Sequence, residues 1–287
     1  MVTEIQRVGV IGAGQMGSGI AEVSARAGLD VVLTDVSDEA AEAGRSRIRK
    51  SLDRAVQNQK IGEADRDAAQ ERIRTTTSLN ELHDRELVIE AIAENEEVKT
   101  KVFAELDQVI DDPEAILASN TSSIPIAKLA AATKRPDRVI GIHFFNPVPV
   151  LKLVELIPSL LTSEQTTQRA ADFATGRLGK ETVRAQDRAG FVVNALLVPY
   201  LLSAIRMVEG GFATAEDVDN GMVLGCAHPM GPLRLSDMVG LDTIKAVADS
   251  MYAEYKDPSY AAPPLLQRMV DAKLLGKKSG KGFYEYG

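Results

Sequence analysis

The stretch that decides the fold of this 287-residue chain is Arg7-Val8-Gly9-Val10-Ile11-Gly12-Ala13-Gly14-Gln15-Met16-Gly17. An apolar run leads directly into the spacing Gly-x-Gly-x-x-Gly, and a helix-like apolar pattern follows it. A second apolar run ends on Asp35, a little over 20 positions after the first glycine of the motif. Dinucleotide-binding folds place an acidic residue at this spacing to accept from a ribose hydroxyl, so the segment predicts such a fold.

Each glycine of this motif has a physical reason to lack a side chain. Gly12 permits a tight turn, Gly14 lets the backbone approach a pyrophosphate, and Gly17 lets the helix pack close to the strand. The N–H groups and the dipole at the helix start then face the phosphates. The motif therefore predicts a nucleotide site, with Gln15 and Met16 in the same turn.

The composition is that of a globular protein: 45% of the residues are hydrophobic and 26% are charged. A net charge of −8 argues against nucleic acid, which needs a broad basic face, but it allows a local basic pocket. No window reaches the roughly 18 uncharged apolar residues of a membrane span, and the first residues form no secretory leader. Cys226 is the only cysteine, so we expect a cytoplasmic, reducing location and a small, buried side chain at that position.

The length predicts two domains, because 287 residues exceed one ordinary core. Residues 1–188 alternate apolar runs with helical patterns, which is typical of an α/β, Rossmann-type doubly wound sheet. Residues 189–287 carry helical patterns alone and predict an all-α domain. The predicted strands are 7–11, 31–35, 87–92, 115–118, 138–142 and 151–157. The predicted helices of the second domain are 190–210, 214–224, 232–252 and 262–273.

A long helical stretch, 38–74, separates the second predicted strand from the third. It is broken near Ile61-Gly62 and exceeds what one crossover helix needs, so we expect a helical hairpin inserted into the first domain. This stretch is basic in an otherwise acidic protein, through Arg45, Arg47, Arg49, Lys50 and Arg54. These charges predict either an anion-binding surface or a solvated helix face.

His143 follows the predicted strand 138–142, and open α/β sheets bind ligands at the carboxyl ends of their strands. In the strand 151–157, alternation places Glu155 among apolar neighbours, where a carboxylate needs a partner. A buried Glu that accepts from one imidazole nitrogen fixes the tautomer and leaves the other nitrogen for proton transfer. The pattern favours a His143–Glu155 pair; the alternative is that Glu155 pairs with Lys152 or with an arginine at a sheet edge.

The remaining polar candidates are ambiguous from the residues alone. The segment 119–123, Ser-Asn-Thr-Ser-Ser, follows another predicted strand and either contacts a substrate and a ribose or forms a turn that caps a helix. Asn194, early in an apolar helix, is either a cap or a ligand contact. His83 and His228 are expected in solvent and in a turn, respectively. The histidines and the cysteine show no metal-ligand spacing, so no metal is expected.

Taken together, these motifs resemble the 3-hydroxyacyl-CoA dehydrogenase family, and within it the free-standing bacterial 3-hydroxybutyryl-CoA dehydrogenases. The resemblance covers essentially the whole chain. Its most specific part is the block His143-Phe144-Phe145-Asn146-Pro147 with the Glu that follows. The segments that carry it are 12–17, 90–95, 119–123, 143–147, 152–155, 187–194, 228–232 and 278–284.

The resemblance implies an NAD-dependent oxidoreductase of fatty acid β-oxidation or butanoate metabolism. It would interconvert (S)-3-hydroxyacyl-CoA, with 3-hydroxybutyryl-CoA expected, and the 3-ketoacyl-CoA, acetoacetyl-CoA. His143 is then the general acid and base, Glu155 orients it, and the substrate-polarising residues are Ser122 and Asn194. The NAD contacts that the resemblance implies are Gly12, Gly14, Gln15, Met16, Gly17, Asp35, Glu94, Lys99, Asn120 and Asn146.

The CoA contacts implied by the resemblance lie on the helical insertion, where this chain departs from the family pattern. Family members carry a Ser and, seven positions later, a Lys. Ser51 matches, but Asn58 stands at the Lys position, with Lys60 close by. Ser51 and Lys60 are therefore the expected contacts to an acyl-CoA thioester, and the basic insertion favours CoA.

Two other functions are compatible with the same fold. An NAD-dependent dehydrogenase of a free hydroxy or sugar acid would share the catalytic His. A structural or NAD-sensing protein would not need both His143 and Glu155, so their presence argues against it. A homodimer through the second domain is expected from the resemblance and from the apolar segment 191–207, with neither nucleic acid nor a membrane as partner.

Overall fold

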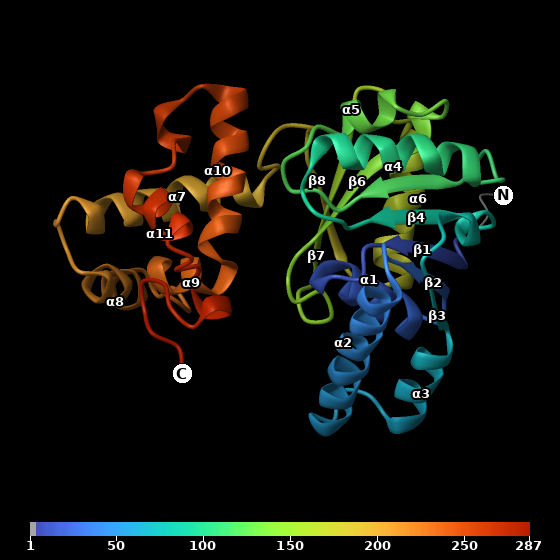
Figure 1. The fold of residues 1–287 in the computed structure, drawn as a ribbon, viewed down its shortest axis with the longest axis horizontal. Coiled ribbons are helices and arrows are strands. Elements are labelled where there is room, and N and C mark those ends of the chain that lie inside the picture. The colour runs from blue at the N-terminus through green and yellow to red at the C-terminus, as the bar shows by residue number, and fades with distance from the viewer. Residues whose placement is uncertain (1–3) are drawn as a thin grey trace. The chain divides into compact units, whose positions relative to one another are not determined.

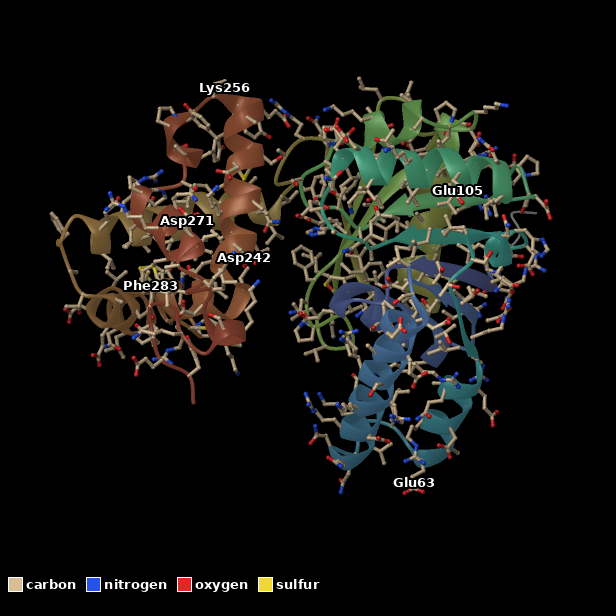
Figure 2. The ribbon with its side chains drawn as sticks, in the orientation of Figure 1. Glu63, Glu105, Asp242, Lys256, Asp271 and Phe283 are labelled. Carbon is tan, nitrogen blue, oxygen red and sulfur yellow. The ribbon has the colours of Figure 1, made fainter. Side chains whose placement is uncertain are left out.

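The structure of the chain is a computed structural model, and it describes residues 4–287 (Figures 1 and 2). The chain divides into two compact units, the first ending at Asp187 and the second beginning at Arg188. Each unit has its own hydrophobic core. The first contains the sheet and the second is helical, so the predicted fold class is confirmed.

The first unit is built on an eight-stranded sheet with the order β3-β2-β1-β4-β5-β6-β7-β8. Neighbouring strands are parallel except β6 and β7, which are antiparallel. The central strands are buried on both faces, which explains their unbroken apolar runs. The strands are β1 (Arg7–Ile11), β2 (Asp30–Thr34), β3 (Ile73–Thr76), β4 (Leu87–Glu90), β5 (Ile116–Ser119), β6 (Val139–Phe144), β7 (Leu153–Pro158) and β8 (Glu181–Arg184).

Helices cover both faces of this sheet, with α4 and α5 on one side of the strands and α1 on the other (Figure 1). The strand order reverses between β1 and β4, which creates a switch point at the carboxyl ends of the strands. The predicted helical hairpin is formed by α2 and α3. The helices are α1 (Gln15–Arg26), α2 (Asp38–Gln57), α3 (Glu63–Glu71), α4 (Glu96–Val109), α5 (Ile126–Ala131) and α6 (Glu164–Asp172).

Side-chain caps fix where several of these helices begin. The Ser37 hydroxyl accepts from the Ala40 N–H at the start of α2, and Asn95 Oδ1 accepts from the Val98 N–H at the start of α4. Helix α1 differs, because its N-cap is Gly14 and its first turn carries no acidic residue. The N–H groups of that turn have no intrahelical acceptor and are suited to an external anion.

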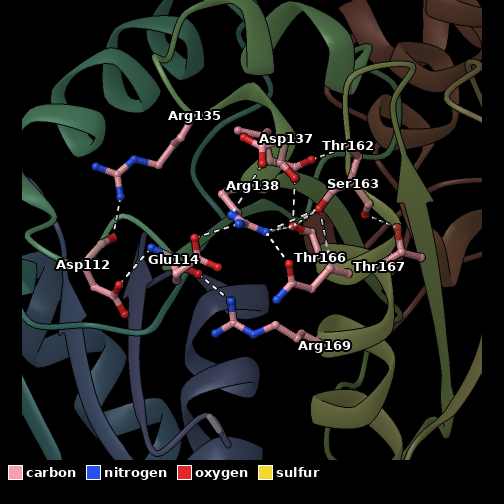
Figure 3. A network of polar contacts seen from close by, with 12 residues as sticks. Asp112, Glu114, Arg135, Asp137, Arg138, Thr162, Ser163, Thr166, Thr167 and Arg169 are labelled. Carbon is pink, nitrogen blue, oxygen red and sulfur yellow. Dashed lines mark hydrogen bonds and ion pairs between the residues drawn. The ribbon is translucent and has the colours of Figure 1, made fainter. Parts of the chain in front are cut away.

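A polar network fixes the amino end of β6, the strand that carries His143 (Figure 3). Arg138 Nη2 donates to Glu114 Oε1 at 2.7 Å, and Arg169 Nη1 donates to the Glu114 carbonyl at 2.5 Å. The Thr162 hydroxyl donates to the Val139 carbonyl at 2.6 Å. The Thr162 bond joins the loop before α6 to the first residue of β6, and Glu114, which precedes β5, connects Arg138 to Arg169 of α6. The amino end of β6 is thus tied to its surroundings.

The second unit packs its helices around a core that includes Leu201, Ile205, Ile244 and Met251. Isolated β-bridges occur near its C-terminus. The C-terminal segment is held against α9 by Asp237, whose carboxylate accepts from two backbone N–H groups of that segment at 3.0 and 2.9 Å. The helices are α7 (Val193–Glu209), α8 (Ala215–Cys226), α9 (Pro232–Val239), α10 (Leu241–Tyr255) and α11 (Pro264–Asp271).

Several predicted boundaries were wrong. The edge strands β3 and β8 were missed, and residues 73–74 belong to β3 instead of the helical insertion. The predicted helix 232–252 is two helices that meet at Gly240, whose φ of 102° no helix allows. Strand β6 extends to Phe144 and β7 begins only at Leu153, so His143 lies within a strand.

Cys226 was expected to be buried, but it is exposed. It ends α8 beside Ala227, a left-handed residue with a φ of 55° that turns the chain away from the helix. Among residues 4–287, no helix is both long and apolar enough to span a membrane. Within the same range, no cluster of three or more His, Cys, Asp or Glu side chains is arranged to hold a metal ion.

Candidate active site

The antiparallel pairing of β6 and β7 sets His143 directly opposite Glu155. His143 Nδ1 lies 2.8 Å from Glu155 Oε2, and the two residues are 6% and 1% exposed. A buried carboxylate at this distance holds the ring in one tautomer and stabilises the imidazolium. Lys152, the alternative partner, precedes β7 in the chain and is exposed.

Neighbouring groups hold the end of β6 in place around this pair. Asn120 Oδ1 accepts from the Phe144 N–H at 2.8 Å, which ties the loop after β5 to β6. The ring of Phe145 lies 4.7 Å from the imidazole, centroid to centroid. Asn120 therefore has a structural contact in addition to its predicted cofactor contact.

The glycine turn fits a bound pyrophosphate. Gly12 has a φ of 97°, and a Cβ there would lie 2.6 Å from the Ala91 carbonyl oxygen. A Cβ on Gly17 would lie 1.7 Å from the Gly12 carbonyl oxygen, so only glycine fits at that contact between turn and helix. A Cβ on Gly14 would meet nothing within 4 Å. The space at Gly14, at the start of α1, is where a phosphate group would approach the backbone.

Asp35 follows β2 and lies beside the same turn. Its Oδ2 accepts from the Ala13 N–H at 2.6 Å, and its Oδ1 accepts from the Val36 N–H at 2.7 Å. These bonds hold a carboxylate next to the glycine turn, where it can accept from a ribose hydroxyl and would repel a phosphate on that ribose. The residues present thus fit NAD.

Behind the turn lies an ionic cluster that the sequence did not reveal. Lys99 is 1% exposed, and its Nζ lies 2.8 Å from Glu90 Oε1 and 3.0 Å from Glu94 Oε2. Glu90 is fully buried and also accepts from the Ser119 hydroxyl at 2.6 Å. A single ammonium therefore joins two carboxylates at the carboxyl ends of β4 and β5.

Glu94 connects this cluster to the predicted substrate residue Ser122. Its Oε1 accepts from the Ser122 N–H at 3.1 Å and from the Ser123 hydroxyl at 2.9 Å, and it also accepts from the Thr121 hydroxyl. Burial raises the pKa of Glu94, but the Lys99 ammonium and these hydrogen bonds outweigh it and hold that pKa below its usual range. Glu94 is therefore an anion that shapes the loop 119–123.

Glu90 is the residue of this cluster to which no role was assigned from the sequence. One signal was present, because Glu90 ends an apolar strand in the same way that Asp35 follows one. Lys99 is enclosed between the carboxylates of Glu90 and Glu94, and its ammonium is paired with both.

The other residues predicted to bind the cofactor or the substrate lie in different surroundings. Gln15 Nε2 donates to Asn146 Oδ1 at 3.0 Å, and both line a cavity of about 180 Å³ together with Ser51. Met16 packs against the core of the first unit. Lys60 is exposed in the turn between α2 and α3. Asn194 is half-buried in the first turn of α7, in the second unit.

Comparison with known proteins agrees with this geometry. The family model described as 3-hydroxyacyl-CoA dehydrogenase, NAD binding domain, matches residues 7–188, and that of the C-terminal domain of the same family matches residues 190–286. A Mycobacterium tuberculosis protein named 3-hydroxybutyryl-CoA dehydrogenase is 64% identical over 286 residues, which cover 100% of each chain.

Two solved structures have the same architecture. The crystal structure of M. tuberculosis FadB2 is similar with a TM-score of 0.98 at 64% identity, covering 99% of this chain and 100% of that one. The crystal structure of (S)-3-hydroxybutyryl-CoA dehydrogenase PaaH1 from Ralstonia eutropha gives a TM-score of 0.92 at 46% identity, with coverage of 99% and 100%.

Proposed function

We propose that this chain, which belongs to the 3-hydroxyacyl-CoA dehydrogenase family and is an NAD-dependent oxidoreductase, interconverts (S)-3-hydroxybutyryl-CoA and acetoacetyl-CoA. The observation that carries the proposal is the buried pair of His143 and Glu155, 2.8 Å apart at the carboxyl end of β6. The names of the M. tuberculosis and R. eutropha relatives support the substrate. Such a reaction belongs to fatty acid β-oxidation or butanoate metabolism.

When bound, NAD accepts a hydride from carbon 3 of the substrate or returns it. The chain must supply the accompanying proton transfer, and we assign it to His143. Because Glu155 engages Nδ1, Nε2 is the atom that takes the proton of the 3-hydroxyl group and returns it to the ketone oxygen in reduction. Glu155 acts through the ring, by stabilising the imidazolium that forms.

Two further residues are proposed to polarise the substrate oxygen. The backbone N–H of Ser122 donates to Glu94, which fixes the loop and leaves the hydroxyl group as the donor we assign to the substrate. Asn194 would supply a second donor from the start of α7. The predicted NAD contacts, from the glycine turn to Asn146, would bind and orient the cofactor.

A steady-state assay with NADH and acetoacetyl-CoA tests this proposal. Replacing His143 by Ala should lower kcat by about 10²- to 10⁴-fold with the fold intact, because a general acid and base is lost. His83→Ala is the matched control, since His83 contacts Asp111 on the surface. Normal turnover by the His143→Ala variant would refute the mechanism.

The assay also tests the substrate. We expect a flat or falling kcat/KM from C4 to C10 thioesters, whereas a long-chain enzyme would gain up to about 0.8 kcal/mol per buried methylene. Free acetoacetate should lose most of the activity, because binding of the remote CoA helps to position the reacting carbon. Full activity with the free acid would favour the alternative, a dehydrogenase of free hydroxy or sugar acids.

We also propose that the second unit forms a homodimer in the cytoplasm. Leu196 on α7 is 75% exposed and Leu224 on α8 is 83% exposed. Burying these two side chains against a partner subunit would be favourable. The single cysteine suits a reducing compartment. Sedimentation at micromolar concentration tests the dimer, and a stable monomer would contradict it.

A further inference from the structure

The ionic cluster of Glu90, Lys99 and Glu94 carries a net negative charge. Glu90 accepts from the Lys99 ammonium at 2.8 and 3.1 Å, and also from the Ser119 hydroxyl at 2.6 Å. It accepts from the Ile92 N–H at 2.7 Å as well, and a carboxyl group that accepts from all of these donors is ionised. Glu94 is an anion too, because it pairs with the same ammonium at 3.0 Å and accepts from a serine hydroxyl. Two carboxylates therefore share one ammonium, which leaves one negative charge uncompensated.

The charges at the start of α4 do not cancel this one. Lys128 pairs with Glu96 at 2.7 Å, so that pair adds no net charge. Glu97, in the same first turn of the helix, is a further acid. The dipole of α4 contributes about half a positive charge at its N-terminus, which Glu97 offsets. The carboxyl end of β4 therefore keeps its negative charge.

Burial gives this charge a long reach. The side chains of Glu90 and Lys99 are 0% and 1% exposed, so solvent does not screen them, whereas the Glu94 side chain is 30% exposed. Glu90 is completely enclosed, so it cannot touch a bound ligand. The part-exposed Glu94 is the member through which the cluster meets the site.

The cluster lies between the glycine turn and His143 in the order of the strands. The turn follows β1 and His143 belongs to β6, and β4 and β5 are the strands between them. Glu90 is paired in register with Ile11 of β1 on one side and with Ser119 of β5 on the other. Because Asp35 after β2 marks the adenosine end, the nicotinamide end must extend across β4 and β5 to reach a substrate at His143.

The two forms of the cofactor differ in charge at this end. The nicotinamide ring is positive in NAD⁺ and neutral in NADH, so a fixed negative charge nearby attracts the oxidised form and leaves the reduced form nearly unaffected. For two unit charges about 12 Å apart at an effective dielectric constant of about 20, this attraction changes a binding constant about tenfold.

We propose that the net charge of this cluster sets the redox preference of the bound cofactor by stabilising NAD⁺ relative to NADH. Glu90 is the positioning residue of this effect. It neutralises Lys99 from behind, so the charge of Glu94 remains to act on the nicotinamide; without Glu90, the ammonium would neutralise Glu94 instead. This inference goes beyond the proposed substrate, and it rests on the proposed role of His143 only in placing the nicotinamide end.

The test is Glu90→Gln, which removes one negative charge and keeps the shape of the side chain. The Ser119 hydroxyl can accept from the new amide instead of donating. Without substrate present, the Kd for NAD⁺ is measured by calorimetry and the Kd for NADH by the fluorescence of its reduced ring. We expect the Kd for NAD⁺ to rise about tenfold and the Kd for NADH to change less than about twofold. A tenfold change in this ratio raises the midpoint potential of the bound couple by about 30 mV.

Three further variants separate charge from structure. Glu94→Gln removes the same charge from the other carboxylate and should shift the ratio of the two Kd values in the same direction. Glu90→Asp keeps the charge but shortens the side chain, so any loss of binding should be equal for both forms and leave the ratio unchanged. Glu105→Gln is the matched control, because Glu105 is exposed on the same helix, nearer its C-terminal end (Figure 2).

The ratio of the two Kd values decides the outcome. An unchanged ratio, or an equal rise of both Kd values, in Glu90→Gln would overturn the proposal and leave the cluster a structural role. Tighter binding of NAD⁺ by this variant would also overturn it, because the ammonium would then dominate the field. If Glu90→Gln does not fold, Glu94→Gln decides by the same criteria, since Glu94 is part-exposed. The titrations need no substrate, so their result is independent of whether the unaltered protein reduces acetoacetyl-CoA, which tests the proposed function.

Discussion

The sharpest test of the buried pair is Glu155→Gln, which keeps the shape of the side chain and removes its charge. The imidazole becomes positive only as it takes the substrate proton, so the carboxylate stabilises the transition state more than the bound substrate. The Nδ1–Oε2 distance is 2.8 Å and the two residues are 6% and 1% exposed, so little solvent screens their interaction. A charge-assisted hydrogen bond contributes about 1.5–3 kcal/mol. Since about 1.36 kcal/mol changes a rate tenfold, kcat should fall roughly 10- to 150-fold.

The assay is the oxidation of 3-hydroxybutyryl-CoA under saturating NAD, with KM and thermal unfolding measured on the same protein. KM should change little, because the loss is confined to the transition state. Glu181→Gln on the neighbouring strand β8 is the control, since Glu181 is exposed. An unchanged kcat, or a loss of kcat matched by a lost fold, would show that Glu155 serves only packing.

Three further predictions concern the cofactor site and the C-terminus. Gly14→Ala should weaken NADH binding and leave the melting temperature unchanged, because its methyl group meets no protein atom. Gly17→Ala should weaken NADH binding and also lower the melting temperature, because its methyl group would clash with backbone atoms. Equal melting temperatures of the two variants would contradict this. Because the Asp35 carboxylate would repel the extra phosphate of NADPH, kcat/KM with NADPH should be at least about tenfold lower than with NADH. Asp35→Asn should reduce this difference in kcat/KM between the two cofactors. Burial, then the charge of Asp237 and its hydrogen bond, raise the pKa of Tyr286 to about 12 from 10.0. The neutral phenol should therefore contribute its full stability below about pH 10, and this contribution should be lost as the pH rises towards about 12. In base-unfolding experiments, Asp237→Asn should narrow this pH range, because it removes the charge that helps to raise the pKa of Tyr286.

Much of the fold could be predicted because its parallel core leaves a strong pattern. Strands β1, β2, β4 and β5 are buried on both faces, so each reads as an apolar run, and the glycine turn marks the first crossover. The edge strands β3 and β8 lack that pattern, because their side chains are mostly exposed or polar. The apolar pattern in the sequence therefore identifies strands that are buried on both faces, and it does not identify exposed strands.

The ionic cluster of Lys99, Glu90 and Glu94 could not be predicted from the sequence pattern either. Lys99 lies on a helix with charged neighbours, and helical charges usually face solvent, so nothing local distinguishes it. Its burial arises from Glu90, which lies at the end of a different element. The resemblance implied that Lys99 and Glu94 contact NAD, but the third member became visible only when β4, β5 and α4 were placed together.

The direction of β7 explains why His143 and Glu155 meet at all. Ligand sites in such sheets lie at the carboxyl ends of parallel strands, and His143 is the penultimate residue of β6. Glu155 is the third residue of β7, so in a parallel strand it would lie in the amino-terminal half, away from that edge. Because β7 runs antiparallel to β6, its amino-terminal half lies at the ligand edge, and Glu155 is brought opposite His143. The alternation of residues along β7 predicted which face of the sheet Glu155 occupies. Only the antiparallel direction of β7 explains why Glu155 lies at the edge of the sheet where ligands bind.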